Sequence, residues 1–92
     1  MNVQHDETAR RFSLSAPEGE AVLDYERAAD GRIVFTHTFV PVALRGRRMG
    51  EPLARAALTW ARENGLAVEI RCSYVARFLE KHPEFTPPEK QP

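Results

Sequence analysis

Hydrophobic and polar side chains alternate in short runs over the first forty residues, a period typical of strands with one buried face. Turn-forming residues separate the runs: residues 16–19 stand before the second run, and Asp30 and Gly31 stand before the third. Tight turns join antiparallel neighbours, so we expect a three-stranded meander. The predicted strands cover residues 10–14, 20–27 and 32–40.

The third predicted strand carries apolar side chains on both faces. Strict alternation divides its side chains into two rows: Ile33, Phe35, His37 and Phe39 in one, and Val34, Thr36, Thr38 and Val40 in the other. Because both rows contain large hydrophobic groups, we expect this strand inside the sheet with cover on both sides. In the second strand the apolar row is Ala21, Leu23 and Tyr25.

After a loop over residues 41–50, the spacing of apolar residues becomes helical. A first helix is expected over about residues 51–64, where Gly65 follows as a stop signal. Its apolar stripe is Met49, Leu53, Ala56, Ala57, Trp60 and Ala61. Residues 66–71 predict a fourth strand, after which Ser73 is a suitable N-cap for a second helix that ends at Pro83.

The predicted order is therefore β-β-β-α-β-α, an α+β fold. A helical crossover makes the third and fourth strands parallel and the connection right-handed, while the first three strands remain an antiparallel meander. We expect a single domain over residues 10–85. Residues 1–9 are predicted to be a loose N-terminus, and the proline-rich residues 86–92 a loose C-terminus.

Composition disfavours several classes of protein. Thirteen basic and thirteen acidic residues balance to zero formal charge, so neither a nucleic-acid binder nor a membrane-surface binder is expected. No apolar run reaches the ~20 residues of a membrane span, and no secretory signal pattern is visible. The single cysteine, Cys72, forms neither an internal disulfide nor a zinc site by itself. We therefore expect a cytoplasmic protein without a metal.

The basic charge is nevertheless concentrated in the loop before the first helix, at Arg45, Arg47 and Arg48. Backbone amides at a helix N-terminus lack internal partners, and Gly46 and Gly50 allow a ligand to approach the main chain closely. A strand–loop–helix junction of this kind favours phosphate or pyrophosphate binding, although a solvated basic turn has the same composition. The spacing matches neither a P-loop nor a three-glycine dinucleotide fingerprint.

Three blocks of sequence resemble the GCN5-related N-acetyltransferases, above all their small stand-alone YjdJ/NATD1-like branch. The blocks are His37-Thr38-Phe39-Val40-Pro41; Arg45-Gly46-Arg47-Arg48-Met49-Gly50 with Leu53 and Ala57; and Cys72-Ser73-Tyr74-Val75 with Phe78, His82 and Pro83. The resemblance implies that acetyl-CoA, as co-substrate, lies between the splayed third and fourth strands. It assigns cofactor contacts to Phe39, Val40, Arg45, Gly46, Arg47, Arg48, Met49, Gly50, Ser73 and Tyr74.

Arg48 departs from the family pattern, which has a glycine at this position. A residue other than glycine there either adopts a negative φ or accepts strain of about 1–3 kcal/mol. Its guanidinium could compensate through a charged hydrogen bond to phosphate, or its bulk could narrow the loop.

Cys72 and His37 are the candidate catalytic residues. Cys72 closes the fourth strand beside a helix start and follows Arg71, a setting that favours a reactive thiolate. The resemblance places it near the thioester, where it would either accept the acetyl group or only line the acyl pocket. His37 would flank the cleft as a base, although a lone cysteine or histidine in an apolar row is usually a core residue.

The family resemblance implies the first two of three candidate functions, and the arginine-rich loop alone suggests the third. The leading one is acetyl transfer from acetyl-CoA to an amine, either a protein lysine or a small amine. The second is a non-catalytic acyl-CoA-binding module, and the third is an RNA-binding domain, which the balanced charge disfavours. A monomer or weak homodimer is expected, with residues 10–14 as an edge strand available for pairing.

Overall fold

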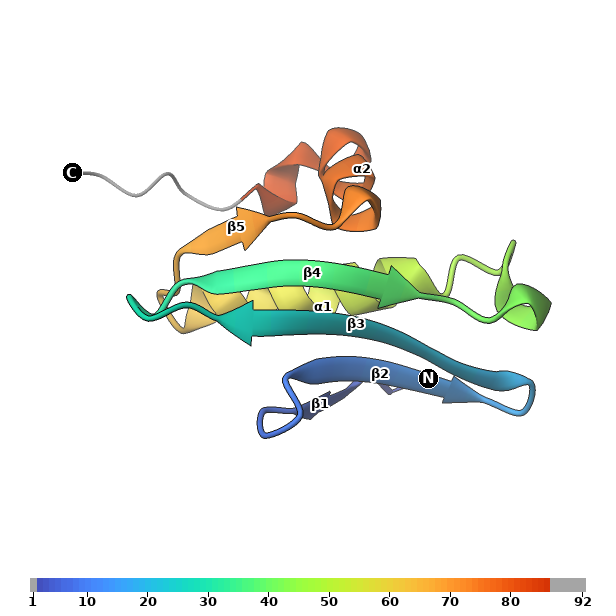
Figure 1. The fold of residues 1–92 in the computed structure, drawn as a ribbon. Coiled ribbons are helices and arrows are strands. Elements are labelled where there is room, and N and C mark those ends of the chain that lie inside the picture. Colours follow the sequence, from blue (N-terminus) through green and yellow to red (C-terminus); the bar gives the residue numbers. More distant parts are fainter. Residues whose placement is uncertain (1, 87–92) are drawn as a thin grey trace.

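The computed structural model describes residues 2–86 as one sheet with two α-helices (Figure 1). The strands are β1 (Gln4–Asp6), β2 (Arg11–Ala16), β3 (Gly19–Arg27), β4 (Ile33–Phe39) and β5 (Val68–Ile70). The helices are α1 (Gly50–Glu63) and α2 (Ser73–Lys81), with 3-10 turns η1 (Val42–Leu44) and η2 (Pro83–Phe85). The predicted α+β class is confirmed, with one strand more than expected. The predicted loose C-terminus lies outside the described residues except for Thr86.

The five strands lie in the sheet in the order of the chain, β1-β2-β3-β4-β5. The first four pair antiparallel through tight turns, and β4 pairs parallel with β5 from Ile33 opposite Val68 to Phe35 opposite Ile70. Helix α1 makes the crossover between these two parallel strands, as the sequence predicts.

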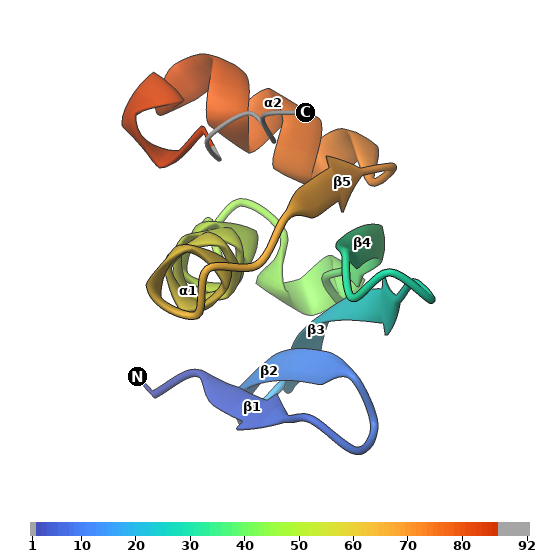
Figure 2. The ribbon, with the colours of Figure 1, turned by 90° about the vertical axis from the view of Figure 1, so that its left-hand side faces the viewer.

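Helix α1 packs on one face of the sheet, and no described helix covers the other face (Figure 2). The side chains that α1 buries are Leu53, Ala54, Ala57, Leu58 and Ala61. They meet the buried row of β3 that the sequence predicts, Ala21, Leu23 and Tyr25. Ala56 and Trp60 of the predicted stripe are only half-buried, because they lie at the border of the contact.

The prediction of a loose N-terminus is wrong for residues 4–6, which form β1. His5 pairs with Phe12 of β2, and its imidazole stacks on the Phe12 ring with 3.9 Å between centroids. His5 Nε2 is hydrogen-bonded to the Tyr25 hydroxyl at 2.7 Å, and the His5 and Trp60 rings meet edge to face with 4.6 Å between their centroids. This aromatic cluster holds β1 in place through His5. The strand therefore forms without the alternating apolar residues by which a strand is usually predicted.

Strand β4 does not alternate strictly. Asp24 of β3 lies opposite His37 and Tyr25 lies opposite Phe35, so Thr36 is an extra residue on β4. Such a β-bulge leaves one residue without a partner and exchanges the faces of the side chains that follow it.

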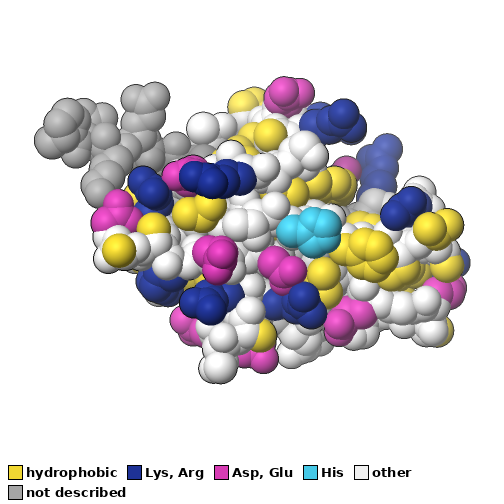
Figure 3. Space-filling model, in the orientation of Figure 1, with side chains coloured by type: hydrophobic (Ala, Val, Ile, Leu, Met, Phe, Trp, Pro, Cys, Tyr) yellow, Lys and Arg dark blue, Asp and Glu magenta, His cyan; other side chains and the backbone are white. Residues whose placement is uncertain are grey.

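The prediction that both faces of β4 are covered is wrong, because no described helix packs on the second face (Figure 2), and the bulge decides which side chains of β4 lie there. Beyond it, Thr38 and Val40 turn toward the helices, whereas His37 and Phe39 are exposed on the open face. The predicted row of Ile33, Phe35, His37 and Phe39 is therefore split between the two faces, with the first two residues buried and the last two exposed. Figure 3 looks onto the open face, where acidic and basic side chains lie among apolar ones.

Candidate functional site

Strands β4 and β5 separate after three paired residues. The amides of Arg71 and Cys72 both donate to the carbonyl oxygen of Phe35, at 2.9 and 3.0 Å, and this shared acceptor ends the ladder. Strand β4 continues to Phe39, while the segment after β5 turns away into α2 (Figure 1). The last part of β4 therefore has no strand beside it on the side of β5.

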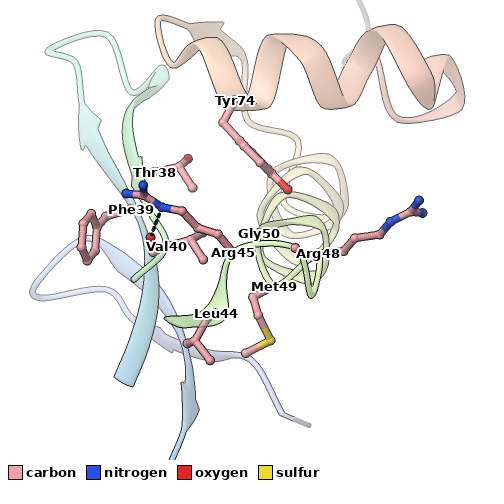
Figure 4. Close-up of a pocket in the computed structure, with 10 residues that line it drawn as sticks. Thr38, Phe39, Val40, Leu44, Arg45, Arg48, Met49, Gly50 and Tyr74 are labelled. Atoms are coloured by element: carbon pink, nitrogen blue, oxygen red, sulfur yellow. Dashed lines mark hydrogen bonds between the residues drawn. The ribbon is translucent and has the colours of Figure 1, made fainter. Parts of the chain in front are cut away.

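A pocket of about 380 Å³ lies where the end of β4, the loop before α1 and the first turn of α2 meet (Figure 4). Its lining residues are Thr38, Phe39, Val40, Leu44, Arg45, Gly46, Arg48, Met49, Gly50 and Tyr74. All except Thr38 and Leu44 are among the predicted cofactor contacts. Strict alternation places Thr38 in one row with Val34 and Thr36, whereas the bulge at Thr36 turns Thr38 toward the pocket. Leu44 is fully buried and holds the loop by packing, and an apolar side chain of this kind does not by itself indicate a binding site.

The loop ends in a group of backbone amides that point to no protein acceptor within residues 2–86. They belong to Gly46, Arg48, Met49 and Gly50. The amide of Arg47, between them in the chain, donates to the carbonyl of Leu44 at 3.2 Å. Met49 is the N-cap and Gly50 the first residue of the fourteen-residue helix α1, and Gly46 and Arg48 lie in the loop just before it, so an anion such as a pyrophosphate fits this group of amides.

The three arginines of the loop have different environments. Arg45 Nε donates to the carbonyl of Val40 at 3.0 Å, and Arg47 forms an ion pair of 3.1 Å with Glu18 at the β2–β3 turn. The Arg48 side chain extends away from the other lining residues and makes no hydrogen bond or ion pair with residues 2–86 (Figure 4). The structure therefore does not gather the three guanidinium groups around the amides.

Arg48 has a φ of +56°, the left-handed conformation, so the strained alternative expected for a residue other than glycine is the one adopted. This conformation costs a side-chain-bearing residue about 1–2 kcal/mol. Gly46 has a φ of +90°, which a glycine adopts freely. The loop therefore turns sharply at Gly46 and Arg48, and Arg48 carries the strain.

Tyr74 forms the wall of the pocket on the side of α2. Burial, and then the nearby Glu51 carboxylate, raise the pKa of its phenol, so the hydroxyl is protonated at neutral pH. On its other side lies a smaller pocket of about 170 Å³. The residues that line it are Glu51, Tyr74, Arg77, Phe78 and Lys81.

Cys72 is buried, with 6% of its surface exposed, and is not among the lining residues. Its Sγ lies 3.0 Å from Oγ1 of Thr38, which does line the pocket. Cys72 is also the N-cap residue of α2, so the prediction that Ser73 caps this helix is wrong, and Ser73 is exposed outside the pocket. The Arg71 guanidinium pairs with Glu69.

His37 is exposed on the open face of the sheet and is not among the lining residues. The structure therefore does not bring the two candidate catalytic residues together in this pocket. Within residues 2–86 no cluster of three or more His, Cys, Asp or Glu side chains is placed to hold a metal ion. No helix of that range has the length and apolar character needed to cross a membrane.

Known proteins are similar to this chain in sequence and in fold. Residues 11–87 match the family model of the GCN5-related N-acetyl-transferases. Protein NATD1 of Danio rerio is 35% identical over 85 residues, which cover 90% of this chain and 77% of that protein. Protein NATD1 of Homo sapiens is 34% identical, with coverage of 90% and 75%.

A solved structure also shares the fold. The solution structure of a GCN5-like protein from Staphylococcus aureus matches with a TM-score of 0.70 and 25% identity, over 98% of this chain and 92% of that one. Proteins with this fold typically use acetyl-CoA. By its sequence and its mixed sheet with a parallel pair at one end, the chain belongs to the GCN5-related N-acetyltransferase family.

Proposed function

We propose that the chain transfers an acetyl group from acetyl-CoA to an amine, with the pocket at the end of β4 as the acetyl-CoA site. The observation that carries this proposal is the group of four free amides, Gly46, Arg48, Met49 and Gly50, at the mouth of the pocket. Backbone amides at a helix N-terminus bind phosphate groups. The free edge of β4 offers main-chain groups to the amides of the pantetheine arm.

The reaction needs few groups from the protein. The amine nitrogen attacks the thioester carbonyl carbon and loses a proton to water, and the carbon–sulfur bond then breaks. The sulfur keeps the electron pair and takes up a proton as free coenzyme A. Positioning of the thioester beside the amine supplies much of the acceleration in such a transfer.

Two roles for Cys72 and one for His37 stay open within this proposal. Cys72 would have to move past Thr38 to attack a thioester, because the thiol is buried and outside the pocket lining. His37 would act as a base only on an amine that arrives from the open face. The acceptor is a protein lysine or a small amine.

A non-catalytic acyl-CoA-binding module is the second candidate function. It is favoured by one observation, that neither Cys72 nor His37 lines the pocket. Binding without turnover over a broad panel of amines would identify the chain as such a module.

Titration of the ¹⁵N-labelled protein with acetyl-CoA tests the proposed site. We expect shifts at the four free amides, and none at Gly31 and Gly65, which lie in turns outside the pocket. Calorimetry gives the affinity, and assays of the amine panel give the turnover. No binding at millimolar acetyl-CoA would end the proposal.

A further inference from the structure

Thr38 marks the end of the pocket that lies furthest from the phosphate-binding amides along β4. The lining continues from the loop through Val40 and Phe39 to Thr38. Figure 4 shows the Thr38 side chain on the same side of the strand as Tyr74, with the Phe39 ring on the other side. A ligand that holds its phosphates at the loop and lies along β4 would bring its acyl end to this threonine.

The hydroxyl of Thr38 has a hydrogen-bond partner, the thiol of Cys72, on its buried side. Cys72 Sγ lies 3.0 Å from Oγ1, and the thiol belongs to the hydrophobic core. A hydroxyl has one proton to donate and two lone pairs that accept, while a thiol is a weak donor. When the thiol donates to Oγ1, the hydroxyl proton of Thr38 is left for an acceptor in the pocket.

We propose that the Thr38 hydroxyl donates a hydrogen bond to the thioester carbonyl oxygen of a bound acyl-CoA, and that Cys72 orients this hydroxyl. The inference rests on the proposed function of the pocket. Thr38 is then a catalytic residue, because it touches the reacting group. Cys72 is a positioning residue that acts through Thr38.

The hydrogen bond would strengthen during the reaction. As the amine attacks the carbonyl carbon, the carbonyl oxygen gains negative charge, and a donor already in place stabilises that charge. When the carbon–sulfur bond breaks, the charge returns from oxygen to form the amide carbonyl, and the electron pair of the broken bond leaves with sulfur. Thr38 keeps its proton throughout, while water takes the amine proton and supplies the one on sulfur.

The test compares Thr38→Val, which keeps the shape and removes the hydroxyl, with Thr38→Ser, which keeps the hydroxyl. Loss of one oxyanion donor lowers kcat by about 100–1000-fold in known cases. We expect Thr38→Val to lower kcat by about 100-fold with little change in KM, and Thr38→Ser to restore most of it. Thermal unfolding of both variants shows whether the fold is intact.

A spectroscopic readout separates this role from a structural one. The carbonyl carbon of bound [1-¹³C]acetyl-CoA should resonate upfield in Thr38→Val relative to wild type, and return in Thr38→Ser. Cys72→Ala should lower kcat in part and move the carbonyl resonance part of the way toward that of Thr38→Val. Cys72→Ser keeps a donor for Thr38, so it should recover most of both losses relative to Cys72→Ala. Loss of turnover in Cys72→Ser with an unchanged resonance would overturn the positioning role and indicate a nucleophile.

The remaining outcomes distinguish the two proposals. A wild-type protein that binds no acetyl-CoA overturns the proposed function and this inference together. A wild-type protein that binds acetyl-CoA, with the same carbonyl resonance in Thr38→Val, overturns only the role of Thr38. The resonance decides the question even for a protein that binds without turnover.

Discussion

Tyr74 lies directly against Gly50, the first residue of α1. A Cβ atom at Gly50 would stand 2.5 Å from Cζ of Tyr74 and 2.6 Å from its hydroxyl oxygen, closer than van der Waals contact allows. The last glycine of the loop therefore has a second use beside ligand approach. It lets the wall contributed by α2 close onto the start of α1, and the pocket takes its shape from this contact.

Gly50→Ala should displace Tyr74 and reduce acetyl-CoA affinity by about tenfold, which corresponds to about 1.4 kcal/mol. Stability should change little, because alanine favours a helix by about 0.5–1 kcal/mol and the tyrosine side chain can move. Calorimetry and the Tyr74 ring resonances measure both effects. Gly31→Ala is the control. Its φ of +88° makes alanine destabilising there, but the added Cβ would contact nothing within 4 Å and Gly31 lies outside the pocket, so acetyl-CoA affinity should not change. Equal affinity in Gly50→Ala and wild type would contradict this role.

Arg48→Gly should stabilise the fold by about 0.5–1 kcal/mol. Glycine removes the left-handed strain of about 1–2 kcal/mol, and the greater freedom of the unfolded chain takes back about 0.4–1 kcal/mol. Arg48→Ala keeps the strain and should bring no such gain, so the pair separates conformation from charge. Urea unfolding gives the comparison.

The same two variants test the guanidinium of Arg48. Because its side chain extends away from the pocket, we expect each variant to change acetyl-CoA affinity by less than about fivefold, the range of an exposed charge (Figure 4). A much larger loss, equal in both variants, would show that Arg48 swings back to hold a phosphate.

Glu18→Gln should raise acetyl-CoA affinity by about two- to fivefold, most clearly at low salt. The change frees the Arg47 guanidinium, which pairs with Glu18 at 3.1 Å, and removes a negative charge near the loop. Glu80→Gln, an exposed position on α2, removes the same charge elsewhere. Equal effects of the two variants would mean that only net charge matters.

Stability should fall as the pH falls below about 6.5, through titration of His5. Burial lowers the pKa of His5 from its ordinary value of 6.5, against the opposing effect of Glu7 and Asp6. The unfolded chain therefore binds the proton more readily than the folded one below pH 6.5, and the stability present above that value is lost. Urea unfolding at neutral and mildly acidic pH measures the slope, which His5→Gln should flatten. An unchanged slope in that variant would assign the effect to other groups.

The order of elements and the binding loop follow from local signals. Alternation, helical spacing and the turns at Asp30 and Gly65 are enough for four strands, two helices and the parallel pair. The loop before α1 can equally be predicted from the sequence, because a helix start exposes amides whatever packs around it. Together with the family resemblance, that position accounts for most of the pocket lining.

The features that the sequence misses depend on pairing between distant residues. One extra residue, Thr36, exchanges the faces of everything after it in β4, and only the register with β3 reveals the bulge. It turns Thr38 inward to meet Cys72 and leaves His37 in solvent. His5 likewise holds β1 through rings from three other elements.

The sequence by itself determined the fold class, the family and the position of the candidate anion-binding loop, since periodicity and motif spacing are properties of neighbouring residues. Only the tertiary structure decided which side chains enter the pocket. A side chain's direction depends on strand register and on the partner it packs against, as Tyr74 does on Gly50 and Thr38 on Cys72. The loop could therefore be found from the chain alone, whereas the contact between Thr38 and Cys72 at the far end of the pocket could not.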